Sequence, residues 1–253
     1  MYAPATAQAA PGIALEGISL DFEGRPLFAD LSLTLGGGRT TCILGPSGCG
    51  KSTLLKLMAG APNLDFSGQV RFGSGGTAST QVAWMSQNDL LLPWLTLRDN
   101  VLLGARLRGE LSPEKGARAL ELIHEAGLAG YEDKLPEALS GGMRQRGALL
   151  RTLMEERPVI LMDEPFSALD ALTRVRLQNL SARLTKGATV VLVTHDPMEA
   201  LRLGHDIIVL GGTPVRVLET IEPAGPPPRE AGSSEVTGLY AGLLRRLMNG
   251  EAA

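Results

Sequence analysis

The stretch Gly45-Pro46-Ser47-Gly48-Cys49-Gly50-Lys51-Ser52-Thr53 decides the fold of this chain. It satisfies the pattern G-x-x-x-x-G-K-[ST], with the two outer glycines and the Lys-Ser pair in register. Residues 40–44 before it are β-branched or apolar, and residues 54–59 after it keep the apolar spacing of a helix. The sequence therefore predicts a strand, a glycine loop and a helix, which is the context that a phosphate-binding loop requires.

Each part of this loop has an expected role toward a nucleoside triphosphate. Glycines allow backbone conformations closed to other residues, so successive N–H groups can point at phosphate oxygens at the positive end of the following helix. Lys51 is expected to reach the β- and γ-phosphates, and Ser52 to ligate Mg²⁺. We interpret Cys49 as a tolerated small side chain. The alternative is a glycine-rich turn that merely joins a strand to a helix.

Composition narrows the function classes. The chain has 253 residues, with 24 Lys and Arg against 27 Asp and Glu, and hence a net charge of −3. This length favours one large α/β domain or a core with a smaller subdomain, and the charge argues against a general nucleic-acid-binding protein. Two cysteines suit a reducing compartment. Residues 1–12 have no signal-peptide pattern and predict a flexible extension, and no stretch approaches the roughly 18 to 20 apolar residues that cross a bilayer.

Polar residues follow two apolar runs that predict buried strands. Residues 158–162 deliver Asp163 and Glu164, and residues 189–193 deliver His195 after Thr194. The carboxyl ends of the strands of an open α/β sheet are where ligands bind. Asp163 suits a contact to Mg²⁺ through water, Glu164 can orient and polarise an attacking water, and His195 can reach the γ-phosphate. The alternatives are that the acids cap a helix and that the histidine is structural.

Two further side chains are candidates for the nucleotide site. Phe22, in a turn region of the period-two stretch 13–35, can stack on an adenine face, which contributes roughly 1–3 kcal/mol. Gln87, just after the predicted strand 81–85, can extend its amide toward a metal-bound water. A core phenylalanine and an ordinary surface glutamine are the alternatives. Residues 90–95 are unusually apolar for a segment that contains Pro93, and they predict either a contact surface or packing under the next helices.

The region from Arg98 to Arg157 is helical in character and predicts a separate helical insertion. Near its end, Ser140 stands in an N-cap position before Gly141 and Gly142. The free N–H groups of that helix terminus make a second anion-binding site, although such turns are common caps. Beyond the core, residues 206–218 predict a hairpin, and residues 239–247 predict a terminal helix that packs on the core through its leucines.

The order of these pieces resembles the ATP-binding cassette (ABC) family of ATPases from about Ile13 to Leu218. The resemblance implies an α/β fold with a P-loop NTPase (RecA-like) core, an N-terminal antiparallel β subdomain and an inserted α-helical subdomain. It implies an ATPase domain over residues 13–220, with the helical insertion at about 90–157, and a Pro-rich linker with a C-terminal helix over residues 221–253. The chain departs from the family at Gly147, where relatives mostly carry a β-branched or apolar residue.

The resemblance also implies site roles, which we write as expectations. The residues with implied catalytic roles are Lys51, Gln87, Glu164 and His195. The residues with implied Mg²⁺ contacts are Ser52, Gln87 and Asp163. ATP would contact Phe22, the loop residues Gly45, Pro46, Ser47, Gly48, Cys49, Gly50, Lys51, Ser52 and Thr53, and the helix end Ser140, Gly141 and Gly142. In this family the helix end acts on the ATP of the opposite subunit of a head-to-tail homodimer.

The narrower resemblance is to importers for nitrate, sulfonate, taurine and thiamine-precursor pyrimidines, through Leu92-Pro93-Trp94 and residues 141–146. It implies an energy-coupling subunit on the cytoplasmic face of the inner membrane. Its partners would be permease subunits at Gln87–Trp94 and a periplasmic or extracellular solute-binding protein that takes the cargo. The rival hypotheses are a soluble ABC ATPase that is not coupled to transport and a protein with a dead nucleotide site.

Overall fold

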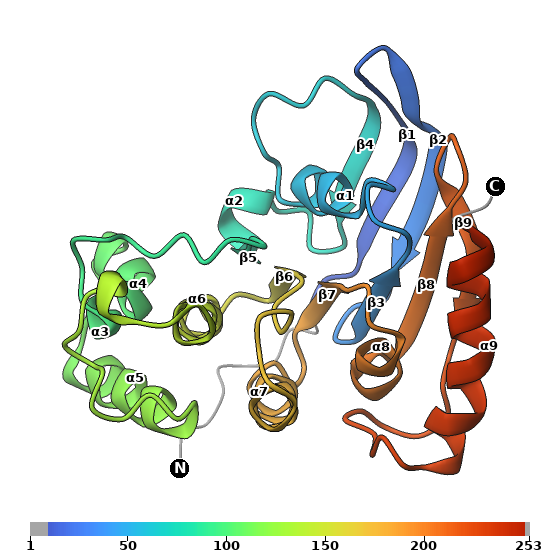
Figure 1. The fold of residues 1–253 in the computed structure, drawn as a ribbon. Helices are drawn as coiled ribbons and strands as arrows, with labels where there is room; N and C mark the ends of the chain where they lie inside the picture. The colour runs from blue at the N-terminus through green and yellow to red at the C-terminus, as the bar shows by residue number, and fades with distance from the viewer. Residues whose placement is uncertain (1–9, 251–253) are drawn as a thin grey trace.

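The computed structural model describes the backbone of residues 10–250 and the side chains of residues 10–247. Two sheets form its framework (Figure 1). An antiparallel sheet has the order β2-β1-β4, with β1 (Ile13–Phe22), β2 (Arg25–Leu35) and β4 (Ser67–Phe72). Most of the predicted extension over residues 1–12 lies outside the described residues. Pro11, however, is buried, and its carbonyl oxygen accepts a 2.8 Å hydrogen bond from Thr189 Oγ1.

The second sheet has six strands in the order β5-β6-β7-β3-β8-β9. Its strands are β3 (Thr40–Leu44), β5 (Val82–Met85), β6 (Val159–Asp163), β7 (Thr189–Val193), β8 (Asp206–Gly211) and β9 (Arg216–Ile221). All neighbours pair in parallel except β8 and β9, which form the predicted hairpin. The carboxyl ends of β3, β6 and β7 therefore meet at one edge, which is where the predicted site residues are needed.

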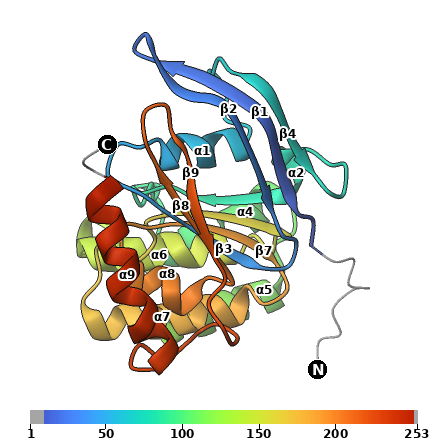
Figure 2. The same ribbon diagram turned by 90° about the vertical axis from the view of Figure 1, so that its right-hand side faces the viewer.

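Both faces of this sheet are buried, and its side chains alternate between two hydrophobic clusters. In β6, for example, Leu161 belongs to the cluster beneath the antiparallel sheet, while Met162 belongs to the cluster under the other helices. Helix α1 (Lys51–Met58) lies between the two sheets and contributes its leucines to the cluster beneath the antiparallel sheet (Figure 2). Helices α7 (Ala171–Leu184) and α8 (Pro197–Leu203) cover the opposite face.

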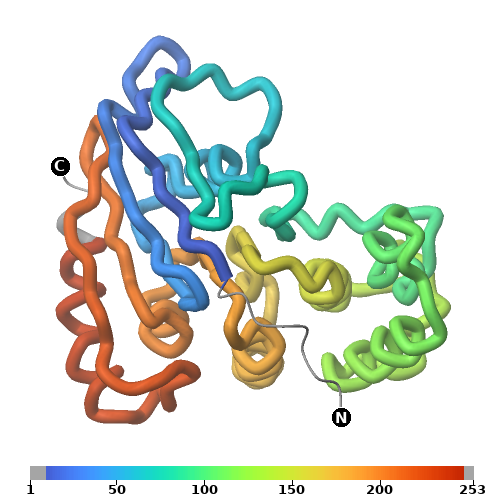
Figure 3. The backbone as a smooth tube through the Cα atoms, turned by 180° about the vertical axis from the view of Figure 1, so that it is seen from behind, coloured from blue at the N-terminus to red at the C-terminus, as the bar shows by residue number. Residues whose placement is uncertain are grey.

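The middle of the chain forms a group of helices at one side of the molecule (Figure 3). It contains α3 (Leu97–Val101), α4 (Leu103–Leu107), α5 (Pro113–Glu125), the 3-10 turn η1 (Pro136–Ala138) and α6 (Gly141–Leu153), and it follows the short helix α2 (Ala78–Gln81). Helix α6 joins this group to the sheet, because it contacts β5 as well as α3 and α5. The α/β fold with an antiparallel β part and inserted helices is as predicted, whereas the domain limits stay a prediction.

The last helix, α9 (Ser234–Gly250), packs against α8, as predicted for the terminal segment. Val236 and Leu243 are fully buried there, but Leu244 is exposed. The expectation that Leu244 shares the packed face is wrong, because one residue beyond Leu243 turns it by about 100° around the helix. Among the helices of the described residues, none combines the length and the apolar character that crossing a bilayer requires.

Candidate nucleotide site

The loop between β3 and α1 has the backbone that its glycines predict. Gly48 and Gly50 adopt φ angles of 80° and 84°, in the left-handed region that favours glycine. A side chain at Gly45 would place a Cβ atom 2.8 Å from the carbonyl oxygen of Leu210 and 2.7 Å from Cys49 Sγ. The loop is thus shaped by close packing against β8 and by its own turn, and α1 begins at Lys51 with free N–H groups.

Lys51 lies at the centre of this loop. Its ammonium donates hydrogen bonds to the carbonyl oxygens of Gly45 (2.8 Å) and Pro46 (2.7 Å), and the residue is only 7% exposed. Cys49 Sγ lies 3.9 Å from Lys51 Nζ. Burial raises the pKa of the Cys49 thiol more than the nearby ammonium lowers it, so the sulfur stays neutral at pH 7. The loop therefore presents one concentrated positive charge.

The acids lie opposite this loop, at the end of β6. Asp163 is buried, and burial raises the pKa of its carboxyl group, an effect that the nearby Ser52 hydroxyl opposes. Ser52 and Asp163 thus offer two hard oxygen atoms side by side. Within the described residues no cluster of three or more His, Cys, Asp or Glu side chains forms a metal cage. Two protein oxygens without a full cage are the arrangement that Mg²⁺ uses when phosphates and waters complete its shell.

Glu164 and His195 meet across neighbouring strands. Glu164 Oε1 lies 3.1 Å from His195 Nδ1, and the Glu164 N–H donates to the carbonyl oxygen of Val193. The glutamate has a φ angle of 48°, which residues other than glycine seldom adopt. Such a conformation persists only where the surroundings impose it. The parallel pairing of β6 with β7, in which Asp163 stands opposite Val193, brings these two side chains together.

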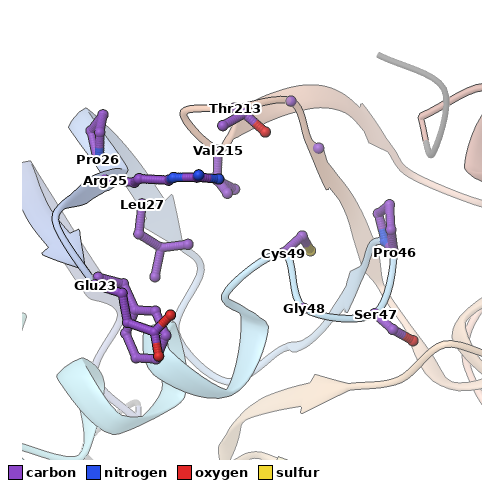
Figure 4. A pocket seen from close by; sticks show the side chains of 13 residues that line it. Glu23, Arg25, Pro26, Leu27, Pro46, Ser47, Gly48, Cys49, Thr213 and Val215 are labelled. Carbon is purple, nitrogen blue, oxygen red and sulfur yellow. The ribbon is translucent and has the colours of Figure 1, made fainter.

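Two adjoining cavities connect these groups. One of about 740 Å³ runs from Arg25 and Leu27 on one side to the loop residues Pro46–Cys49 on the other, with the β8–β9 turn above (Figure 4), and Phe22 also lines it. The other, of about 350 Å³, is lined by Lys51, Ser52, Thr53, Gln87 and Glu164 and shares Phe22, Leu27, Ser47 and Gly48 with the first. Phe22 is 59% exposed, so the alternative that it is a core side chain is wrong.

The helix end at Ser140 lies apart from these cavities. Ser140 caps α6 as predicted, because its Oγ accepts a hydrogen bond from the Met143 N–H (3.3 Å), and Ser140 and Gly141 are exposed. A Cβ atom at Gly142 would lie 3.2 Å from the carbonyl oxygen of Ala168, so this helix end touches the loop that follows Glu164. Neither cavity includes Ser140, Gly141 or Gly142. Within one chain the predicted site is therefore in two parts.

Two arginines of α6 join residues 89 and 90, just after Gln87, to this helix. Arg144 Nε donates to Asp89 Oδ2 (3.0 Å), and Arg151 donates to the carbonyl oxygens of Asp89 (2.9 Å) and Leu90 (2.7 Å). Their spacing of seven residues on one face of α6 was the only signal in the sequence. In the segment that these arginines contact and just after it, Trp94 is 71% exposed and Leu90 is 60% exposed, whereas Leu91 is buried. The apolar segment 90–95 is thus partly packing and partly a free surface.

This combination of loop, acids, histidine and capped helix is that of an ATP-binding cassette. Residues 28–167 match the family model described as ABC transporter. The dimeric structure of the bacterial ABC transporter cassette MJ0796 superposes with a TM-score of 0.73 at 29% identity, over 84% of this chain and 99% of that one. The chain belongs to the ABC transporter family and is an ATP-binding ATPase.

Relatives place it more narrowly within the family. It is 42% identical to an uncharacterized ABC transporter ATP-binding protein of Haemophilus influenzae, over 93% of this chain and 98% of the relative. It is 43% identical to the taurine import ATP-binding protein TauB of Pseudomonas aeruginosa, over 81% of each chain. It is 40% identical to the aliphatic sulfonates import ATP-binding protein SsuB 1 of Rhodococcus jostii, over 96% of each chain. The taurine and sulfonate proteins fall in the predicted importer group.

Proposed function

We propose that this ATPase hydrolyses ATP with Mg²⁺ between two copies of the chain and thereby drives the import of a small sulfonate-type anion. The observation that carries the proposal is the Glu164–His195 pair, 3.1 Å apart, with Glu164 in the same cavity as Lys51 and Ser52. A carboxylate held by a histidine beside a phosphate-binding loop is what in-line attack by water requires. The likeness to taurine and sulfonate importers supports the cargo class.

Each residue of the cavity then has a distinct task. Glu164 accepts a proton from the attacking water, and His195 orients Glu164 and contacts the γ-phosphate. Lys51 leaves the carbonyl oxygens of its own loop for the phosphates, because those are stronger acceptors for its charge. Phe22, on the far side of the cavity, stacks on the adenine, and residues 45–53 surround the phosphates through their N–H groups.

Ser52, Asp163 and Gln87 would hold Mg²⁺. Ser52 would ligate it directly, whereas Asp163 and Gln87 would reach it through bound waters, which Mg²⁺ keeps readily. The ion supplies charge neutralisation at the β- and γ-phosphate oxygens. Ser52 and Asp163 lie near each other before the nucleotide arrives, since the Ser52 hydroxyl lowers the pKa of the Asp163 carboxyl group.

The exposed Ser140-Gly141-Gly142 end completes the site of a second copy. It is a helix terminus with free N–H groups, and it lies outside both cavities of its own chain. A two-fold homodimer would therefore bury two ATP molecules, each between Lys51 of one copy and Ser140 of the other. The structure of the similar ATP-binding cassette MJ0796 supports this arrangement, because it is a dimer in a post-hydrolysis state bound to ADP and Pi. Hydrolysis then weakens the contact and opens the dimer.

Membrane partners would contact the segment Gln87–Trp94. Its exposed apolar side chains, Leu90 and Trp94, stand on a loop that arginines of α6 hold in place, so movement of the helical part carries them along. A permease bound to this segment would be displaced each time the dimer opens or closes. The chain would then be peripheral on the cytoplasmic face of the membrane, and a separate solute-binding protein would take the cargo.

A test of the shared site uses Glu164→Gln, which keeps the side-chain volume but removes the base. With ATP and Mg²⁺ this variant should elute as a dimer in size-exclusion chromatography, and with ADP as a monomer. Adding Ser140→Arg should abolish the dimer while ATP still binds, because a long cation blocks close approach to the phosphate. Adding Ser112→Arg, at the N-cap of α5, is the matched control and should leave the dimer intact. A monomer with both nucleotides would refute the shared site.

A further inference from the structure

A third cavity, of about 40 Å³, lies behind the Glu164–His195 pair. Its walls include Glu164 and His195 themselves, together with Thr194, Arg174 on α7 and Glu199 on α8. None of the roles proposed above uses Arg174 or Glu199. The cavity therefore connects the catalytic pair with two helices that the nucleotide does not reach.

Each of two side chains in this cavity has one atom without a hydrogen-bond partner. Glu199 Oε1 and Arg174 Nε are both buried, and neither forms a hydrogen bond with any described residue. Glu199 is 4% exposed. Leaving a buried polar atom unpaired costs roughly 1–3 kcal/mol, and more for a charged group. A water needs only about 10–15 Å³ of such space, so the cavity has room for at least one. Water between an acceptor and a donor satisfies both.

The other atoms of these two side chains hold the loops beside the catalytic pair. Glu199 Oε2 accepts a 2.6 Å hydrogen bond from Thr194 Oγ1, which in turn accepts one from the Asp196 N–H (3.1 Å). These bonds fix the backbone on both sides of His195. Arg174 Nη2 donates to the carbonyl oxygen of Leu169 (3.0 Å), within the loop Ser167–Asp170 that touches Gly142. Arg174 Nη1 also donates directly to Asp196 Oδ2 (3.4 Å), next to His195.

We propose that a water held between Glu199 Oε1 and Arg174 Nε ties the loop of His195 to the loop Ser167–Asp170, which makes Glu199 and Arg174 positioning residues for hydrolysis. The inference rests on the function proposed for Glu164 and His195. Through this tie, the position of the Ser140 helix end, which the second copy uses, is coupled to the geometry of the catalytic pair. Burial raises the pKa of Glu199 to about 7, as expected of a carboxyl group that is almost fully enclosed by protein.

Single-turnover ATP hydrolysis by the full chain tests the tie. Glu199→Leu keeps the volume but removes both oxygens, and it should lower kcat roughly 10- to 100-fold, or about 1.4–3 kcal/mol at 1.36 per decade. The Kd for ATP should change less than about twofold, because the phosphate loop is untouched. Glu199→Gln retains an acceptor for water and should recover most of the rate. A rate loss matched by an equal loss of ATP affinity, or no recovery with Gln, would overturn the inference.

A double-mutant cycle separates the tie from a general loss of packing. Arg174→Met also removes the hydrogen bonds to Asp196 and Leu169, so it should be the slower single variant, and adding Glu199→Leu to it should slow hydrolysis no further if the two share one bridge. Arg183→Met, on the same helix but at the surface beside Glu125, should combine additively with Glu199→Leu. Leu203→Ala, buried in α8 away from the cavity, should lower thermal stability and leave kcat unchanged. Additive losses for Arg174 and Glu199 would refute a shared bridge.

A crystal structure at a resolution that shows waters gives the second measurement. Density within hydrogen-bond distance of both Glu199 Oε1 and Arg174 Nε is expected, and its absence would overturn the inference. The two proposals fail differently. If Glu164→Gln hydrolyses ATP as fast as the unaltered chain, the catalytic assignment fails. If Glu164→Gln is inactive and Glu199→Leu is fully active, only the positioning tie fails.

Discussion

Gly147 is a position where one added methyl group should change the stability of the chain. It lies inside α6, and a Cβ atom there would be 2.7 Å from Leu97 Cδ1 and 3.4 Å from Leu91 Cδ1. Leu97 is fully buried, so its methyl group cannot move without displacing its neighbours. Glycine at this position thus makes room for the leucines under the Gln87–Trp94 segment.

The magnitude follows from two opposing effects. Replacing glycine by alanine inside a helix stabilises it by about 1 kcal/mol. Forcing extra volume into a packed core costs about 1–3 kcal/mol. Gly147→Ala should therefore range from neutral to about 2 kcal/mol destabilising. Gly116→Ala is the matched control, because Gly116 lies inside α5 with nothing within 4 Å of an added Cβ, and it should stabilise by up to about 1 kcal/mol.

Urea unfolding of both variants measures the difference as a shift in midpoint at constant slope. The free energies of unfolding of Gly147→Ala and Gly116→Ala should differ by about 1–3 kcal/mol, with the second variant the more stable. Equal stabilisation by the two substitutions would refute the packing argument, since it would mean that Leu97 and Leu91 leave space above α6.

Three further outcomes are expected. Lys51→Ala should weaken ATP binding at least about tenfold in calorimetry, because a charge-assisted hydrogen bond contributes about 1.5–3 kcal/mol, while exposed Lys56→Ala on the same helix should not. Trp94→Ala should leave stability and the isolated chain's ATPase nearly unchanged and lower transport by the assembled complex; unfolding instead would make Trp94 a core residue, and Leu218→Ala on β9 is the exposed control. Glu199→Gln should gain stability over the unaltered chain by up to about 3 kcal/mol as pH rises from 4.5 to about 7, as measured by denaturant unfolding at each pH.

The sign of the last effect follows from linkage. A carboxyl group whose pKa is higher in the folded chain favours the folded state only while it is protonated, so its contribution is lost as pH rises above the unfolded value. Gln cannot ionise and avoids this loss. The charged or titratable groups around Glu199 are Arg174, Asp196, Arg202, Cys42, Glu164 and His195. A stability difference that is flat with pH would contradict the raised pKa.

Features set by residues close together in the chain could be predicted from the sequence. The phosphate loop, the cap at Ser140 and the hairpin between β8 and β9 depend on glycines, one hydroxyl and a turn within a few residues of each other. The strand that delivers Asp163 was displaced by one residue, because an apolar run marks a buried strand but not its last hydrogen bond.

Features that depend on which segments meet could not be predicted in this way. Periodicity left open whether Phe22 and the segment 90–95 were core or surface, and the fold exposes Phe22 and Trp94 but buries Leu91. Leu244 was misplaced because the direction of the packed face is set by α8 and the sheet, not by the leucine spacing alone.

The sequence by itself determined the family, the order of the elements and the residue types that we propose to hold phosphate and magnesium, because these depend on local spacing that backbone geometry makes specific. Tertiary structure alone decided that Glu164 lies against His195, that Gly147 gives space to Leu97, and that Arg174 and Glu199 share one cavity. Those contacts join residues from separate strands and helices. Their distances depend on how the parallel strands align and how the helices pack, which no local pattern in the chain records.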